Sequence, residues 1–299
     1  MTYALGIDLG GTSIKAVAVT PAGETLAQTN VPFVDRDMEW AHKVRATVGQ
    51  LEHERGGRAS FVGLSAPGLA AKDGRSIAIM PGRLIGLENL DWMTFLNAPQ
   101  PVPVLNDAHA ALLGEVWLGA ARGLRNAIML TLGTGVGGAA MVDGHLLRGA
   151  ISRAGHLGHI SIDWNGPKDD FNTPGSLEHF MGNKFIAQRT GGRFATTHDL
   201  VQAVEHGDKA AEETWLRSVR ALGCAIASFV NVLDPEAAII GGGIARAGRL
   251  LFEPLQKFVA EYEWRAGGYQ VKLLPAQLGE LAGAYGSAAN ALGAVGNGV

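Results

Sequence analysis

Hydrophobic positions in this chain follow two spacings, one with the period of a strand and one with the period of a helix. The first three apolar runs are short and are separated by turn residues, which predicts a meander of three strands. These runs cover residues 3–9, 13–19 and 25–31. Residues 37–55 come next, and within them Trp40, Val44, Val48 and Leu51 recur at the spacing of one helix face. Strands followed by a helix are typical of an α/β protein.

The second half of the chain repeats this order. Strands are expected at residues 59–65 and 101–105, and a helix at Asp107–Leu118 closes the first half. A second hairpin then starts at Ala127. Further helices are expected at residues 177–190, 199–206, 208–233, 244–263 and 279–292, and a buried strand at residues 237–240. Residues 72–100 keep no sustained period and predict an irregular segment. The pattern therefore predicts a duplicated α/β architecture.

Two turns rich in glycine and threonine interrupt the strand-like runs Leu5–Val19 and Leu130–Val142. Glycine has no Cβ, so such a turn brings backbone N–H groups close to an anion. A single glycine hairpin is weak evidence, because these hairpins are common in β-rich proteins. Two of them in matching register predict two related halves that hold one polyphosphate between them.

Composition narrows the class of protein. The 299 residues are 47% hydrophobic and 18% charged, which fits a folded globular protein. A net charge of −3 without a basic cluster gives no electrostatic reason to expect nucleic acid as a partner. The single cysteine, Cys224, excludes an intramolecular disulfide. No signal peptide and no apolar stretch of spanning length are expected, so the sequence predicts a cytoplasmic protein without a membrane partner.

The motifs of this chain resemble those of the sugar kinases of the ROK family. The resemblance runs in order over essentially the whole chain, and four segments carry it. They are GIDLGGTSIK (6–15), LNDAHAALLGE (105–115), LTLGTGVGGAAMVDGHLLRG (130–149) and IIGGGIA (239–245). The resemblance implies an α/β fold of two actin-like (ribonuclease H-like) domains flanking a nucleotide cleft. It also implies phosphoryl transfer from ATP to a hydroxyl of a hexose or hexose-like sugar or polyol, and a homodimer.

The domain division expected from this resemblance is unequal. Residues 1–118 would form a smaller N-terminal actin-like domain, and residues 119–279 a larger C-terminal one. The last helix, at about 280–299, would return to pack on the first domain.

Asp107 stands at the start of a predicted helix, directly after Asn106. Phosphoryl transfer to an alcohol needs a carboxylate that accepts the proton of the attacking hydroxyl. The resemblance places that base at Asp107, with Asn106 beside it at the substrate. From the residues alone, the alternative is that Asp107 caps the helix, because Asn and Asp are preferred N-cap residues.

The resemblance places the nucleotide at the glycine turns. Asp8 would hold Mg²⁺ through water near the β- and γ-phosphates, whereas a structural aspartate there would satisfy turn amides. Lys15 either faces phosphate or is an exposed strand lysine. The residues expected to contact ATP are Asp8, Gly10, Gly11, Thr12, Lys15, Gly133, Thr134, Gly135, Gly137, Gly241, Gly242 and Gly243. The last three either receive adenosine or the α-phosphate, or form only a tight turn before a helix.

The expected sugar contacts depart from the family pattern. ROK sugar kinases typically carry an A-G-E-x-G-H run, and the corresponding run Ala154–His159 has His156 in place of the glutamate. Arg83 lies in a segment where an asparagine is common, and it either meets an anionic or unusual substrate or is a solvated surface arginine. The expected substrate contacts are Gly68, Arg83, Asn106, Asp107, His156, His159 and Glu178. Because these features differ, the resemblance does not identify the sugar.

The cysteines of the family's structural zinc site are also replaced. Asp169, Phe171 and Ser176 occupy the aligned positions, and phenylalanine cannot bind zinc. The sequence therefore predicts no zinc, with packing or hydrogen bonds ordering the loop instead. A different metal site built from His156, His159, His179 and Asp169 or Asp170 is the alternative.

Two other functions stay open at this stage. A sugar-sensing repressor of the same family would need a DNA-binding helix-turn-helix, and the first expected strand begins at Tyr3 with no room before it. A non-catalytic binding protein would not need Asp8, Asp107 and both glycine turns. The sequence thus favours an ATP- and Mg²⁺-dependent kinase.

Overall fold

The computed structural model describes residues 2–295 in two compact units. The first unit comprises Met1–Arg125, Asp143–Gly155 and Ala276–Val299, and the second comprises Asn126–Val142 and His156–Pro275. The first unit thus includes residues 119–125 and 143–155, which the expected division assigned to the larger domain. The last four residues of the expected returning segment 280–299 lie outside the described part of the chain.

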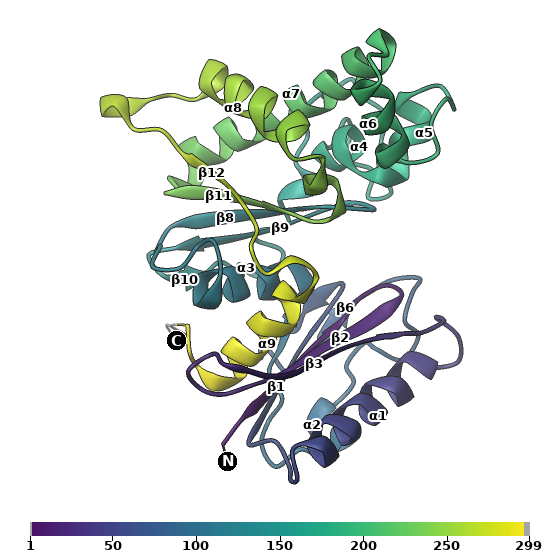
Figure 1. The fold of residues 1–299 in the computed structure, drawn as a ribbon, viewed down its shortest axis with the longest axis vertical. Coiled ribbons are helices and arrows are strands. Elements are labelled where there is room, and N and C mark those ends of the chain that lie inside the picture. Colours follow the sequence, from purple (N-terminus) through teal and green to yellow (C-terminus); the bar gives the residue numbers. More distant parts are fainter. Residues whose placement is uncertain (1, 296–299) are drawn as a thin grey trace. The chain divides into compact units, whose positions relative to one another are not determined.

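The first unit is built on a five-stranded sheet in the order β3-β2-β1-β4-β7 (Figure 1). Strands β1, β2 and β3 pair antiparallel, whereas β4 runs parallel to both β1 and β7. The strands are β1 (Ala4–Leu9), β2 (Ser13–Val19), β3 (Thr25–Pro32), β4 (Phe61–Ala66) and β7 (Val104–Asn106). A separate two-stranded sheet joins β5 (Leu69–Ala70) and β6 (Ile77–Ile79). The predicted meander is confirmed.

The two faces of this sheet carry different packing, because successive side chains of a strand point to opposite faces. Leu5, Ile7 and Leu9 of β1 join the larger core with α1 and α2, whose bounds are Glu39–Glu54 and Trp92–Leu96. The intervening residues Gly6 and Asp8 lie against α9 (Ala282–Leu292) on the opposite face. Figure 1 shows α1 and α9 on these opposite sides of the strands.

Glycines allow α9 to approach the sheet and α3 (Asp107–Leu118) closely. A Cβ on Gly6 would lie 1.9 Å from the Ala284 carbonyl oxygen, and one on Gly63 would lie 2.0 Å from that of Ser287. A Cβ on Gly286 would lie 1.7 Å from the carbonyl oxygen of Ala110 in α3. Real side chains cannot occupy these positions, so backbone contact fixes where α9 lies. The expected return of the last helix to the N-terminal strands is present in the described residues.

The second unit uses the same strand order. Its sheet runs β10-β9-β8-β11-β12, with β8 and β9 antiparallel and with β11 parallel to both β8 and β12. The strands are β8 (Ala127–Leu132), β9 (Val136–Val142), β10 (His145–Leu146), β11 (Ala237–Gly241) and β12 (Lys272–Pro275). Because both sheets join antiparallel hairpins to parallel strands in the same order, the predicted duplication is confirmed.

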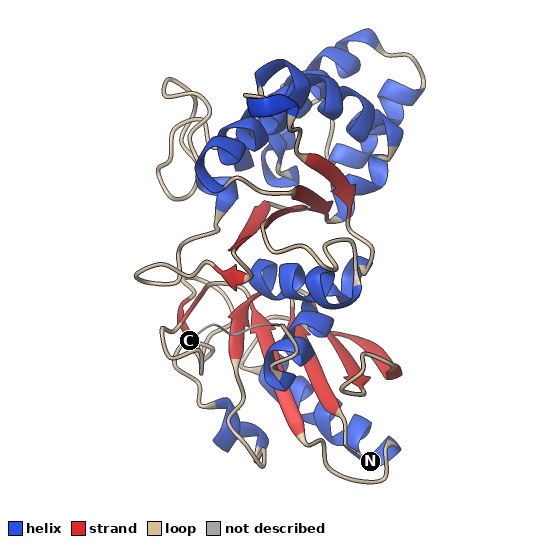
Figure 2. Ribbon diagram, turned by 90° about the vertical axis from the view of Figure 1, so that its left-hand side faces the viewer, coloured by secondary structure: helices blue, strands red, loops and turns tan. Residues whose placement is uncertain are grey.

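The helices of the second unit gather on one side of its sheet (Figures 1 and 2). They are α4 (Leu177–Met181), α5 (Ile186–Arg189), α6 (Thr197–Glu205), α7 (Lys209–Leu233) and α8 (Arg249–Tyr262). The short 3₁₀ helices of the chain are η1 (Leu157–His159), η2 (Asn183–Phe185), η3 (Gly243–Ala247), η4 (Ala266–Gly268) and η5 (Gly279–Leu281).

Helix α7 is long and apolar enough to cross a membrane by length and composition alone, so the expectation that no stretch reaches spanning length is wrong for α7. Half of its most apolar window is buried inside the unit. Gly223 lies against Phe258 of α8, and the Trp215 indole N–H donates to the Leu250 carbonyl. The apolar face of α7 therefore packs against neighbouring protein, as in the core helix of a globular domain.

Other differences from the sequence expectations are local. The expected helix 244–263 is divided at Gly248, whose φ of 55° is not helical. Residues 72–100 contain β6 and α2, which are too short to give a recognisable period. Strand β12 was not expected, because its four residues include a lysine and a proline.

We expect Gly286→Ala to lower the free energy of unfolding by about 2 kcal/mol or more, because the added methyl group overlaps the α3 backbone. Gly49→Ala is the matched control, since Gly49 is an exposed position of helix α1 with open space around its Cβ position. That variant should gain about 0.5–1 kcal/mol from helix propensity. Urea unfolding of both variants measures the difference, and equal stability of the two would contradict the packing described for α9.

Candidate active site

The first unit brings two carboxylates together at the ends of its strands. Asp8 is the fifth residue of β1 and is buried, and its Oδ1 accepts a hydrogen bond of 2.8 Å from the Ser65 hydroxyl. Lys15 lies directly opposite Asp8 in the β1–β2 register. A Cβ on Gly283 of α9 would lie 2.7 Å from the Asp8 carboxyl carbon. The close approach of α9 thus keeps Asp8 out of water.

The electrostatics of Asp8 and Asp107 are coupled. Burial raises the pKa of Asp8 to about 6, the charge of Asp107 adds to this rise, and the Ser65 hydrogen bond and Lys15 oppose it. Burial also raises the pKa of Asp107, against the Ala108 N–H, the Asn106 side chain and Lys15, which lower it. A carboxylate whose ionisation is disfavoured by burial and by a second carboxylate favours a cation nearby.

The start of α3 decides whether Asp107 is the helix cap, which the sequence left open beside its role as a base. Asn106, and not Asp107, is the N-cap of α3, and its Oδ1 accepts the N–H groups of Ala108 and His109. The Asn106 Nδ2 donates to the Gly68 carbonyl at 3.0 Å. Asp107 is the first helical residue and is half-buried. Since Asn106 caps the helix, the capping alternative does not account for Asp107.

The first glycine turn, Gly10–Ser13, is held at several backbone atoms. The Gly10 N–H donates to the Ser13 carbonyl at 2.9 Å, and the Phe33 N–H donates to the Thr12 carbonyl at 3.0 Å. The Arg83 guanidinium donates to the Gly11 carbonyl at 2.7 Å. The Thr12 side chain is exposed at the tip of the turn. Arg83 therefore contacts the first glycine turn directly, and its guanidinium is not solvated by water alone.

The second glycine turn, Gly133–Gly135, is one residue shorter between its closing strand pairs. The N–H groups of Asn183 and Lys184 donate to the Gly133 and Thr134 carbonyls at 2.9 and 2.8 Å. From the other side, the Glu178 carboxylate accepts the Val136 N–H at 2.9 Å. Glu178, expected at the sugar, thus contacts the second turn in this structure. The turn is fixed by α4 and the segment that follows it.

A pocket of about 490 Å³ opens beside the second turn. It brings Gly133 and Thr134 together with Gly243 and Ile244 of η3, and α6 supplies the facing side chains. The lining from α6 and its N-cap comprises Thr196, Thr197, His198, Val201, Gln202 and Glu205, and Asn183 of η2 and Arg246 and Ala247 of η3 complete it. This volume is in the range of small-molecule sites. The sequence analysis predicted nucleotide contacts at Gly133, Thr134 and Gly243, but it did not predict that α6 would line the same pocket. The only sequence signal at α6 is an ordinary capping box at Thr196.

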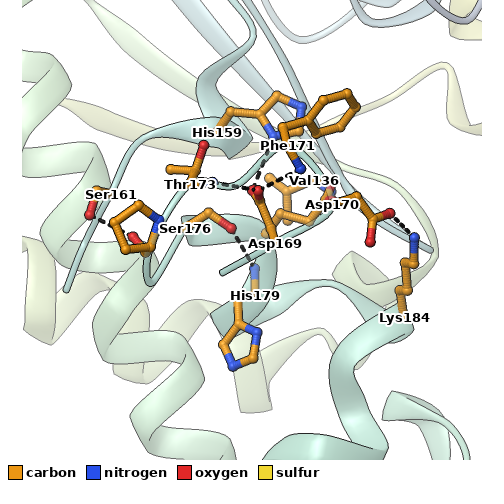
Figure 3. Close-up of polar contacts among 12 residues, drawn as sticks. Val136, His159, Ser161, Asp169, Asp170, Phe171, Thr173, Ser176, His179 and Lys184 are labelled. Atoms are coloured by element: carbon orange, nitrogen blue, oxygen red, sulfur yellow. Dashed lines mark hydrogen bonds and ion pairs between the residues drawn. The ribbon is translucent and has the colours of Figure 1, made fainter. Parts of the chain in front are cut away.

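The loop that precedes α4 is organised around Asp169 (Figure 3). The buried Asp169 Oδ1 accepts the N–H groups of Phe171 and Thr173, each at 2.9 Å. Burial opposes its ionisation, but hydrogen bonds from Thr173, Ser176 and Phe171 lower the pKa of Asp169 below its ordinary value. Its Oδ2 lies 3.6 Å from the His159 Nδ1, and the Phe171 ring meets the His159 ring edge to face at 4.7 Å. Ser176, in turn, is the N-cap of α4.

The three residues at the family's zinc-cysteine positions thus interact through Asp169, which accepts hydrogen bonds from Phe171 and Ser176. Among residues 2–295, no group of three or more His, Cys, Asp or Glu side chains is arranged to hold a metal ion. The alternative metal site built from the loop histidines therefore finds no support in the described residues.

Burial lowers the pKa of His156 to about 4, with a further contribution from His159, and burial also lowers the pKa of His179. Both imidazoles are neutral at pH 7.

Comparison with known proteins adds to this geometry. The sequence profile of the ROK family matches residues 4–293. A glucokinase of Thermotoga maritima is 32% identical over 315 residues, which cover 95% of each chain. The crystal structure of a ROK hexokinase from Thermus thermophilus superposes with a TM-score of 0.86 at 30% identity, covering 99% of this chain and 100% of that one. A ROK family glucokinase from Streptomyces griseus, in complex with glucose and AMPPNP, gives 0.80 at 27% identity, covering 97% and 99%.

We expect Asp8→Asn to stabilise the metal-free protein above pH 6. Burial raises the folded-state pKa of Asp8 from its ordinary value of 3.8 to about 6, so ionising Asp8 costs stability as the pH rises through this window. At 1.36 kcal/mol per pKa unit, the variant should gain up to about 3 kcal/mol at pH 8 and almost nothing at pH 4. Thermal unfolding at both pH values measures this. Asp73→Asn, at an exposed turn, is the control, and a variant that is less stable than wild type at pH 8 would refute the coupling.

We expect Asp169→Ala to destabilise the protein by about 2–3 kcal/mol, because the N–H groups of Phe171 and Thr173 lose their acceptor. The matched control is the adjacent Asp170→Ala, which removes only a surface ion pair with Lys184. That change should stay within about 0.5 kcal/mol. Urea unfolding gives both values, and the role assigned to Asp169 fails if the two variants unfold alike.

Proposed function

Because the chain belongs to the ROK family, we propose that Asp107 is the base with which it transfers the γ-phosphoryl group of ATP to a sugar hydroxyl. The chain is an ATP-dependent carbohydrate kinase, since glucokinases match it along almost its whole length. The acceptor we propose is a hexose or a hexose-like sugar or polyol. The observation that carries the proposal is the coupled pair of carboxylates, Asp8 and Asp107.

The position and electrostatics of Asp107 suit a general base. Its raised pKa, caused mainly by burial, makes the ionised carboxylate a better proton acceptor than an ordinary aspartate. The Ala108 N–H donates to its Oδ1 at 2.8 Å, and this bond holds the carboxylate at the start of α3. Asp107 would take the hydroxyl proton as that oxygen attacks the γ-phosphorus.

The same pair fits a magnesium ion. Mg²⁺ is usually held by one or two carboxylates together with water and substrate phosphates. Asp8 is buried beside a second carboxylate, so a cation would relieve the repulsion that raises its pKa. When bound, the ion would offset the negative charge of the β- and γ-phosphates. Asp8, through water, would hold it, and Lys15 across the strand pair would add positive charge.

We assign the nucleotide to the glycine turns. The Gly10–Thr12 and Gly133–Gly137 turns would donate N–H groups to phosphate oxygens, with the hydroxyls of Thr12 and Thr134 alongside. The adenosine would enter the pocket between the second turn, η3 and α6, beside Gly241–Gly243. The cavity volume and the two glycine segments that line it support this assignment.

The residues proposed to contact the sugar indicate the class of the acceptor and not the individual sugar. We propose that His156 and His159 contact sugar hydroxyls, with Gly68 and Asn106 contributing from the first unit. A neutral His156 presents one donor and one acceptor nitrogen. A carboxylate at this position would offer acceptors only, so the hydroxyl pattern selected should differ from that of relatives with glutamate. Glu178 would act by supporting the second turn.

We also propose a cytoplasmic homodimer that binds neither nucleic acid nor membrane. ATP as phosphoryl donor supports the location, and the net charge of −3 supports the absence of a nucleic-acid partner. Size-exclusion chromatography with light scattering tests the dimer.

Asp107→Asn should lower kcat by roughly 10²–10⁴-fold, which is the usual contribution of general-base catalysis, because the amide cannot accept the proton. Binding of the ATP analogue AMPPNP should persist. The wild-type rate should rise with pH through the raised pKa of Asp107, because only the ionised form is a base. ADP release on a panel of hexoses, amino sugars, ketoses and cyclitols measures the rate. Glu54→Gln, an exposed carboxylate of α1, is the control.

Full activity of Asp107→Asn on a sugar that the wild type uses would remove Asp107 from the mechanism. If the wild type turns over none of the compounds yet binds them, the non-catalytic or sugar-sensing alternatives are favoured.

A further inference from the structure

Arg83 contacts the first glycine turn through its side chain, and this contact has no counterpart in the second turn. The Arg83 Nη2 donates to the Gly11 carbonyl at 2.7 Å, and its Nε lies 3.9 Å from the Asp35 carboxylate. In the second turn, the Gly133 and Thr134 carbonyls accept hydrogen bonds from the backbone N–H groups of Asn183 and Lys184. The Gly11 carbonyl therefore depends on a replaceable side chain, whereas the carbonyls of the second turn are held by main chain.

A peptide bond transmits this contact to the opposite side of the turn. The Gly11 carbonyl and the Thr12 N–H belong to one planar trans peptide, so they point in opposite directions. When Arg83 holds the carbonyl, the Thr12 N–H is turned away from Arg83. A glycine on one side of this peptide offers little resistance to its rotation. The hydrogen bond from Arg83 therefore selects one orientation of the peptide.

The segment that carries Arg83 is itself held in an unusual conformation. Leu84 has a φ of 50°, which is uncommon for a bulky residue, and its side chain is buried in the core of the first unit. The Asp35 carboxylate accepts the Leu84 N–H at 3.0 Å and also attracts the guanidinium. Backbone strain persists only where surrounding contacts over-determine it, and it gathers at functional sites. Arg83 is thus anchored before any ligand arrives.

We propose that Arg83 is a positioning residue that fixes the Gly11–Thr12 peptide so that the Thr12 N–H faces the nucleotide phosphates. This inference rests on the proposed function, which assigns phosphate to the turn. It moves Arg83 from the sugar contacts, where the sequence placed it, to the phosphate side. The substrate it serves is the phosphoryl donor, a nucleoside triphosphate.

Arg83→Ala should weaken binding of AMPPNP with Mg²⁺ by roughly tenfold, which is the usual effect of losing one charge-assisted hydrogen bond. The KM for ATP should rise by a similar factor, while the KM for the sugar should change less than about twofold. Arg83→Lys, which keeps a long donor side chain, should recover most of the affinity. Calorimetry measures AMPPNP binding whether or not an acceptor sugar has been found.

Arg58 provides a matched control in the same unit. Its Nη2 donates to the Asn97 carbonyl at 2.7 Å, and its Nε lies 3.9 Å from the Glu52 carboxylate, so its contacts repeat those of Arg83 away from the turn. Arg58→Ala should leave AMPPNP affinity and both KM values unchanged. Equal losses in Arg58→Ala and Arg83→Ala would show a general structural effect and overturn the proposal.

Gly11→Ala tests the contact from the other partner. Gly11 has no positive φ, and the three atoms nearest to an added Cβ would all belong to the Arg83 guanidinium, with Nη2 at 2.7 Å. The substitution should displace the guanidinium and reproduce the loss of Arg83→Ala. When Gly11→Ala is combined with Arg83→Ala, AMPPNP affinity should fall little further than in either single variant, because each change alone already removes the contact. Additive losses would overturn the proposal.

Salt separates positioning from a direct ion pair with phosphate. If Arg83 acts through the peptide, AMPPNP affinity should fall with ionic strength equally in wild type and Arg83→Ala. A weaker salt dependence in the variant would mean that the guanidinium itself binds phosphate, and it would overturn the positioning role. If the wild type binds AMPPNP but phosphorylates no sugar, the proposed function fails, and the binding measurements still decide the role of Arg83.

Discussion

The candidate chemistry of the first unit depends on the burial of one charge. Asp8 lies on the sheet face that meets α9, and the α9 backbone comes so close that only glycine fits at position 283. Water is thereby excluded from Asp8, and burial together with the charge of Asp107 raises the pKa of Asp8. Burial also raises the pKa of Asp107. An ionised pair of this kind is unfavourable without a cation and useful with one. The cost in stability and the affinity for a metal–nucleotide complex have the same physical origin.

Strand alternation explains why the sequence could predict so much of this unit. In β1, the apolar residues Leu5, Ile7 and Leu9 indicate which face of the strand packs into the core. Gly6 and Asp8 therefore lie on the opposite face. The same period predicted the meander, and the polar pair Asn106–Asp107 marked the start of α3. The match to the ROK family profile confirmed the family that the motifs had predicted. Contacts made by irregular segments were not readable. The segment that carries Arg83 has no period, and its partner, the Gly11 carbonyl, is a backbone atom that any residue would supply.

The loop before α4 shows how a chain can keep a loop ordered with different chemistry. Asp169 gathers the N–H groups of Phe171 and Thr173 and lies against His159, while Ser176 links the loop to the helix that carries Glu178. The sequence analysis correctly expected hydrogen bonds and packing in this region. It did not foresee that Glu178 would contact the second glycine turn, because that contact depends on the backbone path of residues 178–184. Loop order and the shape of the phosphate turn are consequently linked in the second unit.

The position of α9 also has a consequence for biosynthesis. The first unit contains the earliest residues of the chain, yet Gly6 and Gly63 contact a helix that begins at Ala282. During translation these strands emerge from the ribosome long before their covering helix exists. Their second face therefore stays open to solvent or chaperones until the final segment is released. A chain that stops short of residue 282 would keep most of its strands and still lack the burial on which Asp8 depends.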